Sequence, residues 1–333
     1  MRNFALHGSA LLLLLARCAP PSGPADDTTA TTGTGTPEPT TGATDEAATT
    51  GEPGTTGVPA ACVPFEPYEL DVLAEPNGLY WRGDLSLLFI ADDDNNRILT
   101  RDESGHGGVF AEIPNPSMDP GSDGLGQIDF DPAGNPYVPS FAFDDPTLGG
   151  VFRVAPDGTS TQLPGLAADL RRVGLDYDDD SGVLYVATYN KDAEGVFVGW
   201  ISAVDPESGG ETMLVGGLEK PVGILALGGK LYVGDQPTRK IYSVDPADPA
   251  LVLLTDEVVA LDQFEPSGDD DNFFSLAYDE QLMTGYVYRV NINGSFTIAA
   301  QGAWEPRGIA FDGVSRIFVS ERDVQRIVVV PAC

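Results

Sequence analysis

The chain has 333 residues, of which 42% are hydrophobic, which is enough for a sizeable core in one large domain or two ordinary ones. Its 18 Lys and Arg residues against 51 Asp and Glu residues give a formal net charge of −33. This charge repels nucleic acid and anionic lipid, so it argues against a nucleic-acid-binding protein and indicates a well-solvated surface or one that gathers cations.

The first 18 residues, MRNFALHGSALLLLLARC, are typical of an export signal. A basic start at Arg2 precedes an apolar run that ends at Leu15 and is followed by Cys18. The end of this run resembles a bacterial lipobox, which implies a lipid on Cys18, although Arg17 stands where a small residue is usual. We therefore expect an exported protein, lipid-anchored to the bacterial cell envelope or, with an ordinary signal-peptidase cut, secreted or periplasmic. The only membrane attachment expected is this anchor.

Residues 19–61 form a second, compositionally distinct segment. They are rich in Thr, Pro and Gly, contain no aromatic residue, and have Val58 as their one large aliphatic residue. A segment of this kind cannot bury a core, and its acidic residues repel one another because no basic residue accompanies them. The composition predicts a disordered, extended linker between the signal and the folded domain.

A Gly-x-x-aromatic step, or a near relative of it, recurs through the rest of the chain. The steps are GLYW ending at residue 81, GQIDF at 130, GLDY at 177, GILA at 226, ALDQF at 264 and GIAF at 311, at intervals of 49, 47, 49, 38 and 47 residues. Second strands follow them in the order LLFIAD, PYVPS, VLYVAT, KLYVGD, FFSLAY and RIFVSE. Third strands such as NRILT and KIYSVDP come next, then a weaker fourth strand such as ETMLVGG, with turn residues between them.

Four antiparallel strands repeated every 40 to 50 residues or so are the signature of a β-propeller. An irregular β-sandwich is the alternative, but it would not give near-equal intervals. The one helical candidate, LPGLAADLRRVG, reads more naturally as a loop. We predict an all-β, six-bladed β-propeller over residues 62–333.

The last unit ends after its third strand, in RIVVVPAC, so its outer strand must come from elsewhere. The segment YELDVLAEPNG at residues 68–78 matches the junction between blades, which predicts that the N-terminal strand completes the last blade and closes the ring. Cys62 and Cys333 bracket this domain, and in an exported protein we expect a disulfide between them, with two free thiols as the alternative.

The phrases PRGIAFDGVSRIFVSERDVQRI and PVGILALGGKLYVGDQPTRKI resemble NHL repeats and the blades of the SMP-30/gluconolactonase/strictosidine-synthase-like superfamily. The resemblance runs from about residue 66 to the end and implies a six-bladed propeller more specifically than any activity. In the lactonase group a Glu, an Asn and an Asp hold a divalent metal in the central channel. By this resemblance Glu75 and Asp235 take the Glu and Asp roles, with one Ca or Zn ion as the implied cofactor.

The Asn role is where the chain departs from the family pattern. Blade four has Val222 where a PNG motif would place the asparagine, whereas Asn77 lies in a PNG of blade one. The implied metal ligands are therefore Glu75, Asn77 and Asp235, and the departure at Val222 argues against lactonase activity.

Polar residues at strand ends form a second set of candidates. Three second strands end in an acid, and the remaining three end in Ser140, Thr188 and Tyr278. Two arginines precede inner strands. We take as binding candidates at one channel mouth Asn77, Asp92, Arg172, Asp235, Arg307 and Glu321. A ring of solvated polar strand ends is the alternative for the same residues.

Other catalytic chemistry is scarce. The chain has two histidines: His7 lies in the predicted signal and His106 in the Gly-rich turn ESGHGG. We therefore expect neither a histidine metal cluster nor a Ser-His triad. Asp176, Asp178 and Asp180 alternate like the start of a calcium loop, but Ala187 stands where such a loop needs Glu. Two hypotheses remain: a monomeric binding scaffold at the cell surface or in the periplasm, for a small molecule or a surface protein, and a metal-dependent lactonase or related hydrolase.

Overall fold

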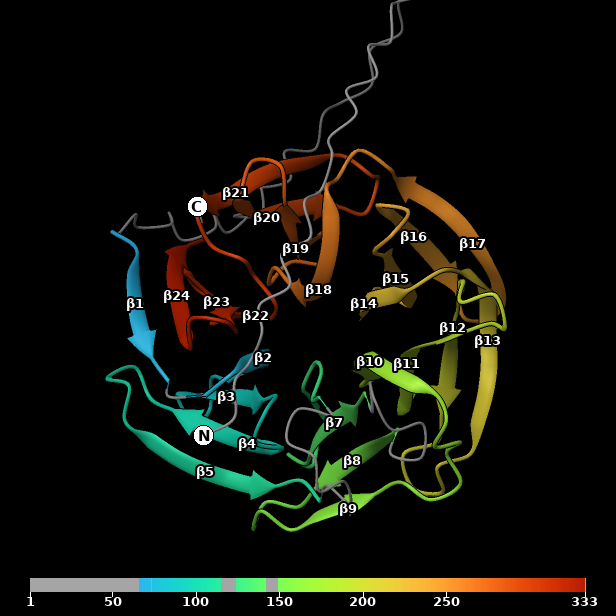
Figure 1. The fold of residues 1–333 in the computed structure, drawn as a ribbon, viewed down its shortest axis with the longest axis horizontal. Coiled ribbons are helices and arrows are strands. Elements are labelled where there is room, and N and C mark those ends of the chain that lie inside the picture. The colour runs from blue at the N-terminus through green and yellow to red at the C-terminus, as the bar shows by residue number, and fades with distance from the viewer. Residues whose placement is uncertain (1–65, 73, 115–123, 142–148, 333) are drawn as a thin grey trace, which may run out of the picture. The chain divides into compact units, whose positions relative to one another are not determined.

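The computed structural model describes residues 66–332 except residues 73, 115–123 and 142–148. These residues form six four-stranded antiparallel sheets around a central axis, which is a six-bladed β-propeller, and they contain no helix (Figure 1). The predicted fold class is confirmed. No helix in the described part of the chain could span a membrane. The proposed lipid on Cys18 and the predicted Cys62–Cys333 disulfide lie outside the described residues.

The first three blades follow one another in sequence. Blade 1 holds β2 (Pro76–Arg82), β3 (Leu87–Asp92), β4 (Arg97–Arg101) and β5 (Gly107–Glu112). Blade 2 holds β6 (Asp129–Phe130), β7 (Pro136–Ser140), β8 (Gly150–Val154) and β9 (Ser160–Gln162). Blade 3 holds β10 (Arg171–Asp178), β11 (Val183–Lys191), β12 (Phe197–Val204) and β13 (Glu211–Leu218).

The next two blades repeat the order, and the sixth borrows a strand. Blade 4 holds β14 (Pro221–Leu227), β15 (Lys230–Asp235), β16 (Lys240–Asp245) and β17 (Asp248–Thr255). Blade 5 holds β18 (Ala260–Pro266), β19 (Asn272–Asp279), β20 (Thr284–Asn291) and β21 (Phe296–Gly302). Blade 6 holds β22 (Ile309–Phe311), β23 (Arg316–Glu321), β24 (Arg326–Pro331) and, on its outside, β1 (Tyr68–Asp71).

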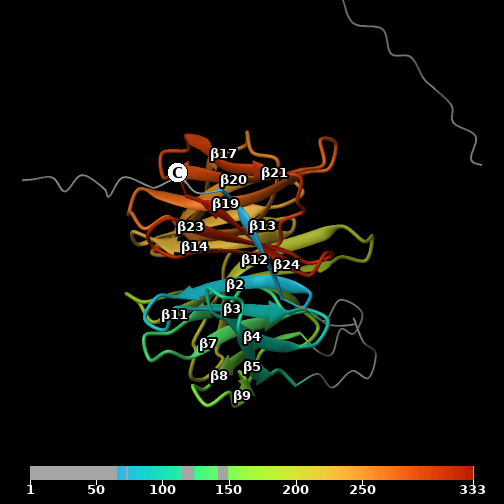
Figure 2. The same cartoon turned by 90° about the vertical axis from the view of Figure 1, so that its left-hand side faces the viewer.

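Strand β1 closes the ring as the sequence predicts. It pairs antiparallel with β24, with Tyr68 opposite Val329 and Leu70 opposite Ile327. In Figures 1 and 2 the blue N-terminal strand lies against the red β24. Because this pairing covers the outer edge of β24, the sixth blade has the same four strands as the others.

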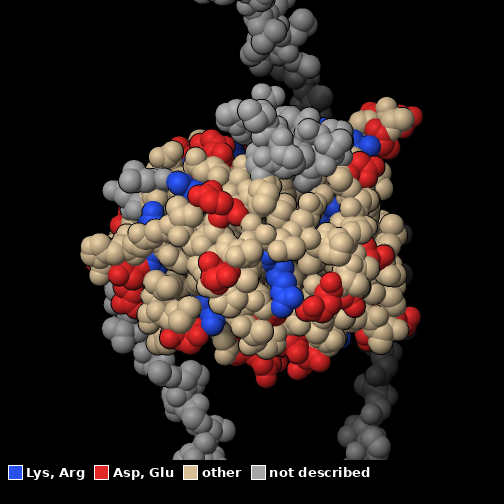
Figure 3. All heavy atoms as spheres, turned by 90° about the horizontal axis from the view of Figure 1, so that it is seen from below, with Lys and Arg blue, Asp and Glu red and all other residues tan. Residues whose placement is uncertain are grey.

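Apolar side chains pack mainly between neighbouring blades. Phe89 of blade 1 meets Phe130 of blade 2 with ring centroids 4.9 Å apart, and five similar clusters fill the other seams. The second strands, such as β3, β7 and β23, are buried along almost their whole length because blades pack on both of their faces, whereas outer strands such as β17 are largely exposed. The rim seen in Figure 3 shows more acidic than basic side chains, as the composition requires.

The repeated glycine of the sequence brings the inner strands together around the axis. A Cβ on Gly126 would lie 1.9 Å from the carbonyl oxygen of Val173 in the next blade, and one on Gly308 would lie 1.8 Å from that of Asn77. Only glycine permits such an approach. Gln127 of blade 2 reaches across the axis, because its Nε2 lies 3.4 Å from the carbonyl oxygens of both Ile224 in blade 4 and Phe264 in blade 5. Two hollows lie along the axis, one at each end of the inner strands.

Candidate functional site at one mouth of the channel

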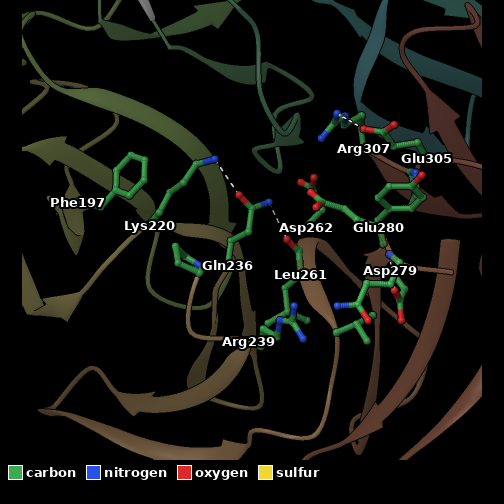
Figure 4. Close-up of a pocket in the computed structure, with 15 residues that line it drawn as sticks. Phe197, Lys220, Gln236, Arg239, Leu261, Asp262, Asp279, Glu280, Glu305 and Arg307 are labelled. Atoms are coloured by element: carbon green, nitrogen blue, oxygen red, sulfur yellow. Dashed lines mark hydrogen bonds and ion pairs between the residues drawn. The ribbon is translucent and has the colours of Figure 1, made fainter. Parts of the chain in front are cut away.

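The first hollow lies where the inner strands begin and the second strands end. It has a volume of about 460 Å³ and is bounded by blades 3 to 6. Figure 4 shows its labelled side chains converging from these blades. The residues that matter for its chemistry are Phe197, Lys220, Gln236, Asp262, Glu305 and Arg307.

Lys220 is a half-buried cation of this hollow. It precedes β14, and its Nζ donates a 2.8 Å hydrogen bond to Oε1 of Gln236. Gln236 is itself held, because its Nε2 donates to the carbonyl oxygen of Leu261 at 2.9 Å (Figure 4). No carboxylate of the described residues forms an ion pair with Lys220.

Burial lowers the pKa of Lys220, Asp262 opposes that shift, and the nearby Arg307, Arg171 and Lys191 add to it. The mouth is thus of mixed charge, because the cations Lys220, Arg239 and Arg307 line it together with four acidic residues, Asp262, Asp279, Glu280 and Glu305. Aromatic rings support it: the Nζ of Lys220 lies 5.8 Å from the ring centroid of Tyr189, and that of Lys191 lies 5.0 Å from the centroid of Phe197.

Asp262 is the carboxyl that faces these cations. It comes from β18, at the point where the pairing of that strand with β19 is shifted between Leu261 and Phe264. Burial raises the pKa of Asp262 to about 6, while Arg307 and Lys220 counteract part of the effect. Arg307 also pairs with Glu305, with Nη2 and Oε1 2.5 Å apart. The hollow therefore combines three cations, a carboxyl whose pKa is raised to about 6, and hydrogen-bonding side chains.

The three acids that end second strands bind the protein's own backbone. Asp235 accepts backbone N–H bonds from Glu219 and Lys220, at 3.2 and 2.8 Å, and a hydroxyl bond from Thr238 at 2.9 Å. In blade 1, Asp92 accepts the N–H of Glu75 at 3.0 Å and pairs with Arg97 at 2.6 Å. In blade 6, Glu321 accepts the N–H of Glu305 at 3.2 Å and pairs with Arg326. Each acid fixes the chain just before the inner strand of its own blade.

The remaining predicted residues are not brought together at one mouth. Arg307 lies in the hollow, but Arg172 does not face a mouth, contrary to our expectation. Its side chain is fully buried and donates to Oε2 of Glu211 at 2.7 Å and to the carbonyl oxygen of Ala167 at 2.8 Å. The buried Asn77 donates its Nδ2 to the carbonyl oxygen of Leu125 at 2.8 Å.

The metal ligands implied by resemblance, Glu75, Asn77 and Asp235, stay a prediction. In blade 4 the carboxylate of Asp235 binds backbone N–H groups and a hydroxyl, and in blade 1 Asn77 donates its Nδ2 to the carbonyl oxygen of Leu125. The pKa of Glu75 is raised by burial and by the neighbouring Asp94 and Asp93, and the charge of Arg322 opposes this shift. Among the described residues no group of three or more His, Cys, Asp or Glu side chains is arranged to hold a metal ion.

Sequence reasoning missed Lys220, Gln236 and Asp262. The sequence does contain one usable signal, because residues just before an inner strand face this mouth. Lys220 directly precedes β14, and Arg307 lies two residues before β22. Asp262 had no such signal, since it depends on the irregular pairing of blade 5.

Comparison with known proteins identifies the fold. No protein-family model matches the chain, and no curated protein matches it in sequence. A gluconolactonase from Xanthomonas campestris has a similar structure, with a TM-score of 0.62 and 15% identity over 84% of this chain and 98% of the other. A calcium-binding protein, regucalcin, from Agrobacterium tumefaciens gives 0.57 and 16% over 78% and 92%. A streptogramin B lyase gives 0.53 and 14% over 81% and 98%. At these identities the likeness shows the six-bladed propeller fold alone.

Proposed function

We propose that this chain is an exported, monomeric binding protein whose Lys220 mouth takes a small anionic ligand. The observation that carries the proposal is the partly buried Lys220 ammonium, which has Gln236 as its hydrogen-bond partner and no ion-pair partner in the described structure. A buried cation that has no carboxylate partner is unfavourable unless a bound anion neutralises its charge. Arg307, in the same hollow, supplies a second positive group that can bind a carboxylate.

The surroundings of Lys220 favour a polyhydroxylated acid over an apolar one. Glu305 and Gln236 offer acceptors and donors for hydroxyl groups, and Phe197 offers one apolar wall. Pockets of about this size hold small molecules of a few rings or fewer. Because a structural neighbour is a gluconolactonase, gluconate is the first anion of this class to test.

The test is calorimetric titration of gluconate into the chain and into a Lys220→Met variant. We expect affinity to fall about tenfold, since a charge-assisted hydrogen bond is lost without much change of volume. Lys230→Met is the matched control, because Lys230 is exposed in the same blade at the other end of β14 and β15. Equal affinity in the Lys220 and Lys230 variants, or no binding of gluconate or other sugar acids to the unaltered chain, would exclude this site.

A second candidate function, lactone hydrolysis without the implied metal set, is favoured by one observation. Asp262 has a pKa of about 6 because of burial, and it faces Lys220, whose pKa burial lowers. Two groups in one hollow whose pKa values are shifted toward neutral pH are typical of acid–base chemistry. In such a reaction Asp262 would accept a proton from an attacking water.

Hydrolysis of gluconolactone, measured above the spontaneous rate, tests this second function. An Asp262→Asn variant should lose nearly all of the added rate while a chelator leaves it unchanged. A rate that disappears with the chelator would support a metal-dependent enzyme instead, and no rate at all would leave the binding function alone.

A further inference from the structure

The second hollow, at the other end of the inner strands, is acidic. It has a volume of about 440 Å³, and the carboxyls of Asp129, Asp176 and Glu265 line it from blades 2, 3 and 5. Asp129 and Asp176 occupy equivalent positions, since they pair with Tyr137 and Tyr185 at the same point of their second strands. The hairpin acids at residues 178–180 stand at its rim, and no Lys or Arg lines it.

Each of the three carboxyls meets backbone donors but no cation. Asp129 accepts the N–H of Tyr177 at 2.5 Å, and Asp176 accepts that of Ala226 at 2.7 Å, so each binds the next blade. Glu265 likewise accepts the N–H of Phe311 at 3.1 Å. No basic side chain of the described residues forms an ion pair with any of them.

Negative charges in this hollow act on these carboxyls. Burial raises the pKa of Asp129 to about 7, with the charge of Asp179 adding to the effect, and burial together with the charge of Asp129 raises those of Asp176 and Glu265 well above their usual range. Tyr80, the equivalent residue of blade 1, has its pKa raised by burial and then by the same three acids, and Arg82 opposes this weakly. A cation in this hollow would relieve the repulsion.

Gln127 gives an independent indication of a ligand. Its side chain is 95% buried, it lines this hollow, and its Oε1 has no hydrogen-bond partner. A buried amide oxygen without a donor is unfavourable, and a ligand N–H would satisfy it. The walls add the aromatic rings of Tyr80, Phe130, Tyr177 and Phe311, whose faces attract organic cations.

We propose that this acidic hollow binds a small organic ammonium ion, which donates hydrogen bonds to Gln127 and to the carboxylates of Asp176 and Glu265. A directly coordinated metal suits it less well, because no three acidic side chains of the described residues are arranged around one point. The aromatic walls favour a ligand with an apolar body. This site is separate from the Lys220 mouth and does not depend on the function proposed there.

Benzylammonium is the probe, titrated into the full chain at about pH 8, where the carboxyls lose protons most readily. Amide NMR resonances of Tyr177, Ala226 and Phe311 report on the site directly, because their N–H groups bind the three acids. We expect them to shift with benzylammonium and not with benzyl alcohol, the neutral analogue of similar shape. Shifts of equal size with both would show a merely apolar hollow, and stronger shifts with calcium chloride would show a metal site; either result overturns the proposal.

Charge-removing variants complete the test. Asp176→Asn and Glu265→Gln keep an oxygen for the backbone N–H, and each should weaken benzylammonium about tenfold. Asp248→Asn is the matched control, because Asp248 is exposed on the outer strand β17 and changes the net charge equally. Thermal unfolding shows whether each variant is folded. Folded variants that bind as well as the control would also overturn the proposal.

Discussion

The two ends of the channel use carboxylates in opposite ways. Where the second strands end, Asp92, Asp235 and Glu321 are surrounded by backbone donors, a hydroxyl or an arginine. Where the inner strands end, Asp129 and Asp176 receive backbone N–H groups of the next blade but no basic side chain. The first arrangement stabilises the fold, whereas the second leaves charge for a ligand to neutralise.

This difference shows that residue type does not decide whether an acid is structural or functional. The register of the strands decides it, because register sets how many donors meet the carboxylate. The same reasoning applies to the cations: the fully buried Arg172 has an acid as its partner, whereas Lys220 at the mouth has the neutral Gln236.

The largest effect is expected for Arg172→Met, which tests a charged side chain that has an ion-pair partner. The change leaves Glu211 without its cation, and the Oε1 of that residue already lacks a partner, so we expect the free energy of unfolding to fall by about 3 kcal/mol. Urea denaturation followed by tryptophan fluorescence measures it. Arg289→Met, which breaks a half-exposed pair with Asp269, should change stability by less than about 1 kcal/mol. Similar losses in both variants would contradict the distinction.

Asp235→Ala tests the backbone-binding acids. It removes the acceptor for the N–H groups of Glu219 and Lys220 and for the hydroxyl of Thr238. We expect a loss of about 2 kcal/mol in urea denaturation, because buried donors are left without partners. Asp248→Ala, at an exposed position, should leave stability almost unchanged. If Asp235→Ala also leaves the free energy of unfolding unchanged, this acid does not stabilise the fold.

The sequence predicted the fold well because the repeated features are those that build a blade. RIFVSE corresponds to β23, KLYVGD to β15, and the closing strand β1 lies where its resemblance to a blade junction placed it. The recurring glycine reflects the close approach of inner strands, a requirement of every propeller of this kind. Such features are local, so they are visible in a single sequence.

The site was less predictable because it depends on contacts between blades. The acid that ends a second strand looks like a channel ligand in sequence, but its position brings it to the backbone of its own blade, as Asp235 shows. Arg172 looked accessible because nothing local revealed Glu211, which lies 39 residues away. Asp129, Asp176 and Glu265 come together only when blades 2, 3 and 5 surround one axis.

At the acidic end, Asp176→Asn should stabilise the chain, in contrast to Asp235→Ala. Burial and the charges of Asp129 and Glu265 raise the pKa of Asp176 in the folded chain above its unfolded value. The carboxyl therefore has no effect on stability at low pH, and it becomes destabilising as the pH rises above about 4 toward the folded pKa. We expect the variant to gain about 1 kcal/mol at about pH 8 and nothing at about pH 4. A gain that does not vary with pH would mean that charge is not its cause.

The smallest expected effect concerns Asp262 at the Lys220 mouth. Burial raises its pKa to about 6, against the influence of Arg307 and Lys220, so this carboxyl is neutral below that pH and charged above it. A charged Asp262 repels an anion bound beside Lys220, and we expect gluconate to bind about threefold more tightly at pH 5 or so than at about pH 8. Calorimetry at both values measures the ratio. In Asp262→Asn the ratio should approach one, because the neutral amide cannot titrate. A pH dependence that survives this substitution would assign it to another group and would remove Asp262 from the anion site.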